Sequence, residues 1–428
     1  MVQIHPGVPP AAVNNSTAPH STRRYAWIVV ALLFPVAMLN YLDRQMIAAM
    51  KVSVMSDVTG MELDAQWGYM LGQFKWVYAF FSPIGGYIAD RFSRRGTICA
   101  SLLVWSFITY LTGQVTSYDQ LLWTRTLMGL SEAFYIPAAL ALISDYHRGP
   151  TRSRATGIHQ MGIYCGVILG GFAGYAADAP SLGWRWAFDF TGLIGILYAI
   201  PLFLILRDVP RDYGKTGDQP SAFSSARELL TNMSFLLLVL YFTLPALAGW
   251  IVRDWMPAIL QQSFDISQGL AGVSATLYWQ GAAILAALGG GWLADRWMRH
   301  SDRGRIYVSA LGMALIIPAL FGVGNAPALG SFGLAIFSLI IFGIGWGCFD
   351  INNMPILCQI ARPQVRATGY GIMNFVSISC GGLADWGFGA MRDRQVPLNA
   401  IFGVFAACCA VSVVLVLLIR PRPSEKPN

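Results

Sequence analysis

Gly86-Tyr87-Ile88-Ala89-Asp90-Arg91 occurs a second time, in altered form, as Gly291-Trp292-Leu293-Ala294-Asp295-Arg296. Each copy ends a long apolar stretch with an acidic residue, and basic residues follow it. From Asp90 to Asp295 the offset is 205 residues, close to half of the 428-residue chain. Repetition at half the chain length is typical of membrane proteins built from two similar halves, and this is the organisation we predict.

The composition places the chain in the membrane class. Hydrophobic residues make up 55% of it and charged residues 12%, and the mean hydropathy is +0.52. Soluble domains carry about 25% charged residues. The net charge of +7 is spread thinly over many loops, which argues against a nucleic-acid-binding surface. The seven cysteines lie in apolar segments without metal-ligand or redox spacing, so we expect them to pack as small hydrophobic residues.

Hydropathy predicts an all-α integral membrane fold. About twenty helical residues cross a bilayer core of about 30 Å. Twelve segments qualify, and the polar stretch 207–232 divides them into six plus six: 25–50, 67–90, 97–117, 119–146, 155–178, 184–206, 235–260, 269–297, 304–325, 330–359, 366–391 and 398–419. The predicted organisation is a disordered N-terminus (1–24), a first bundle (25–206), a linker (207–232), a second bundle (235–419) and a tail (420–428).

The basic residues predict the orientation of the chain. Most of the 29 lysines and arginines fall on one side of the membrane if the N-terminus is placed inside. We therefore expect both termini and the linker to be cytoplasmic in a multi-pass plasma-membrane protein, and a bacterial inner membrane is the expected location.

A second repeat accompanies the first. Arg154-Ala155-Thr156-Gly157 recurs as Arg366-Ala367-Thr368-Gly369, at the start of the predicted fifth and eleventh helices. With the duplicated Gly-x-x-x-Asp-Arg pattern, the chain resembles the major facilitator superfamily over nearly its whole length. The resemblance implies two pseudo-symmetric six-helix bundles around a central cavity. One departure is Ser93, where that family usually has Gly.

The two repeats also suggest a gate. A carboxylate can dock on the free N–H groups at a neighbouring helix N-terminus. The resemblance implies that Asp90 lies near the start of the eleventh helix and Asp295 near the start of the fifth. We expect two cytoplasmic latches between the halves, formed by these acids with the basic residues Arg91, Arg94 and Arg296. The alternative is a solvated loop turn with ordinary basic residues.

Ionisable residues inside the predicted helices are the next signal, because such groups are costly in a bilayer. Arg125 and Glu132 are seven residues apart, which places them on one helix face about 10 Å apart along the axis. Movement of Arg125 relative to Glu132 would change the affinity of the carboxylate for a proton. A permanent structural pair is the alternative. Asp43 and Arg44 lie in the first helix, unless they sit at its outer interface.

These charges resemble those of the anion:cation symporter branch of the superfamily, which includes sugar-acid, hexuronate and sialic-acid carriers. The resemblance implies that Asp43 and Glu132 couple transport to protons and that Arg125 regulates Glu132. It also implies that Arg44, with Tyr41 beside it, binds a substrate carboxylate. The proton would be the coupling ion, with no other cofactor. Spinster-like lipid carriers share nearly the same residues, including Asn-Tyr-x-Asp-Arg-Gln.

Further polar residues fall in the same helices. Lys75 and Tyr78 share a face of the second helix, and the repeat offset places Gln280 opposite Lys75 as a second wall of one cavity. Lys75 could instead extend to the outer surface. Gln160 and Asn374, in the fifth and eleventh helices, are expected to bind substrate hydroxyls together with Gln280. We expect Arg253-Asp254 to be outer-end charges, as are 392–394.

These observations predict a proton-coupled symporter of a small organic anion, with a sugar acid or related hydroxy-carboxylate favoured, which works by alternating access. The alternatives are a spinster-like carrier of lysolipids or lipophilic anions, an exporter or facilitator of another small polar solute, and a nutrient sensor without transport. A membrane enzyme is least favoured, because the sequence shows no metal or nucleophile constellation. The expected partners are the lipid bilayer and an anionic small molecule but no nucleic acid, and the expected functional unit is a monomer.

Overall fold

The computed structural model describes residues 20–147, 151–209 and 222–421. Over these residues the regular structure is helical, apart from an isolated bridge between Thr59 and Ser117. The predicted disordered N-terminus lies mostly outside the described residues, as do much of the predicted linker and nearly all of the predicted tail. Those three predictions therefore stay predictions.

The first half of the chain holds nine helices among its described residues. They are α1 (His20–Ala49), α2 (Lys51–Asp57), α3 (Asp64–Arg91), α4 (Arg94–Thr112), α5 (Tyr118–Glu132), α6 (Tyr135–Tyr146), α7 (Arg152–Gly171), α8 (Ala173–Asp178) and α9 (Gly183–Ile205). The second half follows with α10 (Ala222–Leu230), α11 (Met233–Asp254), α12 (Met256–Phe264), α13 (Gln268–Met298), α14 (Gly304–Asn325), α15 (Phe332–Ile360), the short η1 (Pro363–Val365), α16 (Arg366–Asp393) and α17 (Leu398–Leu418).

Three predicted membrane helices are interrupted. Pro137 is the third residue of α6 and Pro257 the second residue of α12. Proline has no N–H to donate to the preceding turn, so each helix restarts at its proline. The third break, at Phe172 between α7 and α8, follows the helix-weakening pair Gly170-Gly171. With these pairs joined, twelve helices match the twelve predicted segments, and the short α2, α10 and η1 are additional.

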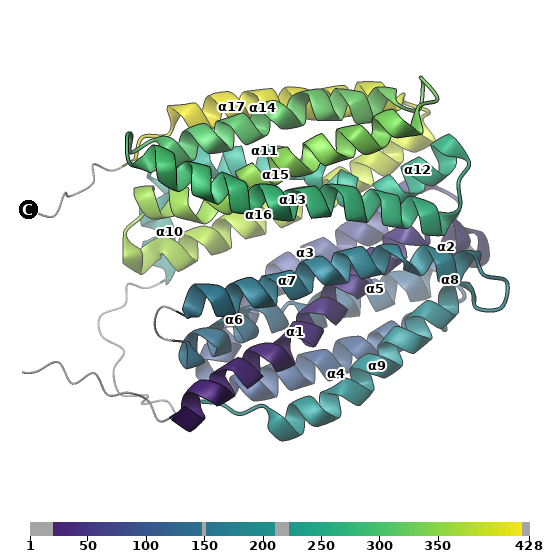
Figure 1. Cartoon of the computed structure of the whole chain (residues 1–428). Coiled ribbons are helices and arrows are strands. Elements are labelled where there is room, and N and C mark those ends of the chain that lie inside the picture. The colour runs from purple at the N-terminus through teal and green to yellow at the C-terminus, as the bar shows by residue number, and fades with distance from the viewer. Residues whose placement is uncertain (1–19, 148–150, 210–221, 422–428) are drawn as a thin grey trace, which may run out of the picture.

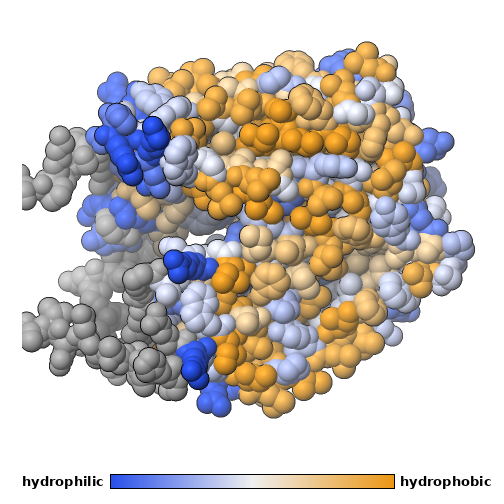
Figure 2. Space-filling view, viewed as in Figure 1, coloured by the Kyte–Doolittle hydropathy of each residue, from blue (hydrophilic) through white to orange (hydrophobic). Residues whose placement is uncertain are grey.

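Eight of the twelve are long and apolar enough to cross a membrane by length and composition: Arg24–Ala49, Tyr118–Tyr146, Gly183–Ile205, Met233–Asp254, Gln268–Met298, Gly304–Asn325, Phe332–Ile360 and Leu398–Leu418. The other four, built on α3, α4, α7 and α16, carry more polar residues. Figure 2 shows an apolar belt around the visible face, with hydrophilic residues gathered at both ends of the helices.

The two halves stack side by side, with α1–α9 in one layer and α11–α17 in the other (Figure 1). We call the end of the bundle that holds Arg24 and Ile419 the terminal end, and the end that holds Lys51 and Asp178 the far end. One apolar core lies within the first half, around residues such as Leu102. The larger core joins the second half to the far end of the first.

The halves are tightly packed at the far end. A Cβ atom on Gly72 of α3 would lie 2.7 Å from the carbonyl oxygen of Gly382 of α16, and one on Gly171 would lie 2.7 Å from the carbonyl oxygen of Gly272. Glycine at these positions lets the backbones touch. Toward the terminal end, by contrast, a Cβ on Gly371 of α16 would meet no atom within 4 Å. Figure 2 shows the surface hollowed there between the two halves.

Two carboxylates join the halves at the far end. Asp393, which ends α16, accepts hydrogen bonds from the backbone N–H groups of Asp64 (2.8 Å) and Ala65 (2.9 Å) at the start of α3. Asp178, which ends α8, accepts from those of Gln268 (3.2 Å) and Gly269 (2.7 Å) at the start of α13. Both contacts use the attraction between an anion and a helix N-terminus. The far end is therefore closed in this conformation.

Candidate functional site

The predicted charges in α1 and α5 meet inside the first half. Asp43 and Arg125 are each 2% exposed, and Glu132 is fully buried. Arg125 and Glu132 share one face of α5, and the side chains of Asp43 and Arg44 of α1 meet them there. Asp43 therefore lies inside the protein, while its depth in the membrane stays a prediction.

The ion pairs differ from the predicted arrangement. Nε of Arg44 donates to Oε2 of Glu132 at 2.6 Å. Arg125, expected to act on Glu132, instead lies 3.7 Å from Oδ1 of Asp43. The Thr109 hydroxyl of α4 donates to the other Asp43 oxygen at 2.6 Å. Because Arg44 bonds directly to Glu132, a proton on Glu132 would release the guanidinium.

Aromatic rings hold Arg44 in place. Its guanidinium carbon lies 4.9 Å from the ring centres of Tyr41 and Phe74 and 4.5 Å from that of Tyr78. Cations are attracted to such ring faces, more strongly where water is excluded. The Nη2 atom of Arg44 is buried, and no hydrogen bond to it is found among the described residues. Arg44 thus keeps a donor free for a further acceptor.

Lys75 lies inside the protein and does not extend to the outer surface. It is 4% exposed, and its ammonium group donates to the carboxylates of Asp254 in α11 and Asp385 in α16. The prediction that Arg253 and Asp254 are outer-end charges is therefore wrong, since Asp254 is 7% exposed and paired across the two halves. Asp393, also predicted to be an outer-end charge, lies at the far end.

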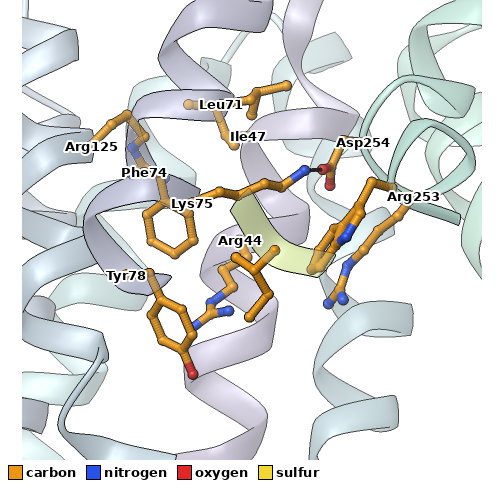
Figure 3. A pocket seen from close by; sticks show the side chains of 11 residues that line it. Arg44, Ile47, Leu71, Phe74, Lys75, Tyr78, Arg125, Arg253 and Asp254 are labelled. Carbon is orange, nitrogen blue, oxygen red and sulfur yellow. Dashed lines mark hydrogen bonds and ion pairs between the residues drawn. The ribbon is translucent and has the colours of Figure 1, made fainter. Parts of the chain in front are cut away.

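Two adjoining chambers lie between the halves. The smaller, of about 40 Å³, is lined by Arg44, Lys75 and Tyr78 together with Arg125 and Asp254. Figure 3 shows the guanidinium groups of Arg44 and Arg253 on the same side of the Lys75 side chain.

The larger chamber, of about 220 Å³, receives the predicted polar residues Tyr41, Gln160, Gln280 and Asn374. Arg253 lines both chambers, as do Trp250 and Ile378. The structure thus brings all seven predicted substrate-binding residues to this pair of chambers, although Lys75 and Gln280 line different ones.

The family model described as Major Facilitator Superfamily matches residues 33–385. The chain belongs to this superfamily. It is therefore a multi-pass membrane transporter.

Its relatives in the superfamily fall into more than one group. The chain is 25% identical over 382 residues to Protein spinster homolog 1 of Xenopus tropicalis, covering 83% of this chain and 70% of that protein. It is 24% identical to the Probable L-galactonate transporter of Escherichia coli (strain K12), covering 99% of this chain and 95% of that protein. Among solved structures, a bacterial homologue of the human lysosomal transporter spinster, inward-facing and unoccupied, matches with a TM-score of 0.73 and 22% identity, covering 92% of this chain and 95% of that one.

The predicted gate residues of this superfamily member all lie at the terminal end. Arg91 bonds to the hydroxyl of Tyr87, and Arg94 joins the start of α4 to Asp145 of α6. Arg296 lies over the Trp292 ring at 5.6 Å. None of these three contacts joins the two halves.

Of the two acids expected to form the latches, the structure describes the side chain of Asp295. The Asp295 side chain is 74% exposed and lies 3.6 Å from Arg305 of its own half, so it is not docked on α7 in this conformation. The side chain of Asp90 lies outside the described part of the chain. Both latches remain predictions for the conformation in which the terminal end closes.

Two further residues line or border the site and were not predicted from the sequence: Asp385 and Arg253. Asp385 lies in an apolar stretch of α16 and is fully buried, and the cost of a charge inside a membrane was the signal that pointed to it. Arg253 lies one residue before the end of α11, where a helix-end charge and a buried charge look alike in sequence. Only the fold distinguishes them, because the first half lies against both side chains: Tyr41 of α1 against Arg253 and Lys75 of α3 against Asp254.

Proposed function

We propose that this transporter is a proton-coupled symporter of a small organic anion, a sugar acid or related hydroxy-carboxylate, which works by alternating access. The carrying observation is the direct bond between Arg44 and Glu132, 2.6 Å long and buried beside the cavity. In this state Arg44, the cation that an anionic substrate needs, is already paired with Glu132. A proton on Glu132 releases Arg44, so proton and anion bind together.

The charge balance of the site supports an anionic substrate. Four basic side chains, Arg44, Lys75, Arg125 and Arg253, face five acidic ones around the chambers: Asp43, Glu132, Asp254, Asp385 and Asp350. Protonation of Glu132 makes this set neutral, and protonation of Asp43 as well leaves one positive charge in excess. An anion that enters with both protons restores neutrality, which matters because uncompensated charge is costly in a buried site.

Arg253 is the second group that we assign to the substrate carboxylate. It borders both chambers, its Nη2 atom is buried without a hydrogen-bond partner, and no carboxylate among the described residues lies within 4.0 Å of it. Arg44 and Arg253 can hold one carboxylate between the halves. Gln160, Gln280 and Asn374 offer amide groups to substrate hydroxyls in the larger chamber.

The orientation in the membrane belongs to the same proposal. Arg24, Arg91, Arg94, Arg296 and Arg299 lie at the terminal end, and basic residues are retained on the cytoplasmic side. We assign that end to the cytoplasm of a bacterial inner membrane. The cavity is then open to the cytoplasm, and the far end is closed toward the outside.

The test is uptake of labelled sugar acids into proteoliposomes under an imposed proton gradient. We expect an uncoupler to abolish accumulation in the wild type. Glu132→Gln, which mimics the protonated acid, should bind substrate independently of pH but fail to accumulate it. Glu62→Gln, an exposed change outside the site, is the control. Gradient-driven uptake that survives Glu132→Gln would overturn proton coupling through this residue.

A lipophilic anion is the second candidate substrate, favoured by one observation. The second half lines the larger chamber with aromatic residues, among them Trp250, Trp279, Trp346 and Phe349. Such a wall suits the apolar part of an amphiphile, as a spinster-like carrier would need. A thermal-shift screen of the purified protein against sugar acids, dicarboxylates and lysolipids separates the two: stabilisation by lysolipids alone would favour the second.

A further inference from the structure

We propose that Asp254 and Asp385 form a binding site for a small monovalent cation, H⁺ or Na⁺, which Lys75 fills as a tethered cation in this conformation. When the halves separate at the far end, Lys75 leaves and a cation from that side takes its place. The inference rests on the alternating access of the proposed function, and it concerns a cluster separate from Asp43 and Glu132.

The first observation in support is that the cation and the two carboxylates belong to different halves. Lys75 belongs to α3 of the first half, whereas both carboxylates belong to the second half, on α11 and α16. Those two helices pack directly against each other. Movement between the halves therefore separates the ammonium group from the carboxylates, while the carboxylates stay together.

The second observation in support is that the cluster buries two negative charges against one positive charge. Asp385 is fully buried, Lys75 is 4% exposed and Asp254 is 7% exposed, so one cation holds two anions away from water. The Oδ1 atom of Asp385 is buried, and no hydrogen bond to it is found among the described residues. The indole of Trp255 is a neutral donor beside this carboxylate, so Lys75 is its one charged partner among the described residues.

Among the described residues, Lys75 is the one basic side chain within 4.0 Å of both acids. Trp250 lies beneath the ammonium group, with its ring centre 4.2 Å from Nζ. Arg253 of α11, Arg44 of α1 and Arg125 of α5 line the same small chamber, and each is held elsewhere by ring contacts. On the far-end side, Lys51 of α2 is bound to Asp64 of α3, and Arg392 lies near the end of α16.

Removal of Lys75 alone would leave two neighbouring carboxylates unneutralised. Such a pair takes up a cation or a proton, because two like charges a few ångströms apart repel strongly in a medium of low dielectric constant. The exchange conserves charge: one ammonium leaves and one cation enters, so the cluster carries one net negative charge before and after. On the return movement Lys75 displaces the cation.

The experiment removes the tethered cation by Lys75→Gln and measures thermal unfolding of the purified full-length protein. Each variant is measured in about 100 mM NaCl and in N-methyl-D-glucamine chloride, at about pH 5.5 and about pH 8.5. We expect the unfolding temperature of the wild type to change little with Na⁺ or with pH. The unfolding temperature of Lys75→Gln should rise by about 3 °C or more in Na⁺ if the site takes sodium, or at the lower pH if it takes a proton.

The double variant Lys75→Gln/Asp385→Asn is the control, because it keeps the charge of the cluster while removing one carboxylate. It should lose both responses and unfold at a higher temperature than Lys75→Gln. A Lys75→Gln protein that responds to neither Na⁺ nor pH beyond the double variant overturns the proposal. So does a Lys75→Gln protein recoverable in none of these buffers while the double variant folds.

Failure of this proposal and failure of the proposed function give different results. Thermal unfolding reports binding without transport, so a Glu132→Gln protein with normal gradient-driven uptake leaves the Lys75→Gln result standing. Conversely, an unresponsive Lys75→Gln protein leaves the pairing of Arg44 with Glu132 untouched.

Discussion

At the scale of single residues, the site is organised by which cation each carboxylate holds. Glu132 holds Arg44, Asp43 lies beside Arg125, and Asp254 and Asp385 share Lys75. The sequence predicted the participants in the first half because a charge inside an apolar helix is conspicuous. It did not predict the partners, since pairing depends on the rotation and depth of neighbouring helices, which spacing within one helix does not determine.

Arg253 gives the most direct prediction at this scale. Arg253→Gln should weaken binding of an anionic substrate by at least about tenfold, because a charged hydrogen bond to the carboxylate is lost. Proton dependence should remain, since Arg44 and Glu132 are intact. Binding is measured by thermal shift or calorimetry with a sugar acid. Arg299→Gln, at an exposed arginine of the terminal end, is the matched control. Equal affinity in the two variants would remove Arg253 from the substrate site.

At the scale of helices, carboxylates dock on helix N-termini of the other half at the far end, whereas the sequence predicted such contacts at the terminal end. The sequence indicated that carboxylates at helix ends dock on helix starts in the other half, and it assigned this to Asp90 and Asp295. In the described residues the docked acids are Asp393 on α3 and Asp178 on α13. The fold follows from the repeats, but the end that is closed depends on the conformation. A sequence alone does not specify one conformation of an alternating carrier.

The far-end contacts of Asp393 and Asp178 can be tested by charge removal. Asp393→Asn and Asp178→Asn should each shift the population toward the far-end-open state by about 0.3–1 kcal/mol, which is roughly twofold to fivefold. The measurement is the distance between spin labels at Ser153 and His300, across the terminal end, in a cysteine-free background. A larger population of short distances is expected.

Asp265→Asn is the control for these two substitutions, because Asp265 is exposed at the same end in a left-handed conformation that Asn also adopts. If all three variants gave the wild-type distance distribution, the two carboxylates would not hold the far end closed.

At the scale of the whole molecule, α3 and α16 form one seam that is tight at the far end and open at the terminal end. Gly72 touches Gly382 in the tight part, whereas Gly371 faces open space. Positions 371, 375, 378 and 382 of α16 follow helical spacing and share one face, so the same face continues from the tight part into the open part. Phe375 on this face is 43% exposed, which is consistent with a surface that the other half covers when the terminal end closes.

This seam predicts opposite effects for the same substitution at its two ends. Gly72→Leu places a side chain where a Cβ already meets the Gly382 oxygen at 2.7 Å, so it should prevent far-end closure and shorten the distance between labels at Ser153 and His300. Gly371→Leu should fold normally, keep the long distance and prevent terminal-end closure. Both should abolish accumulation of substrate, since each blocks one half of the cycle. Gly387→Leu, on α16 with no atom within 4 Å of its Cβ, should change neither distance nor transport. Equal distances in the Gly72 and Gly371 variants would show that the halves do not pivot along this seam.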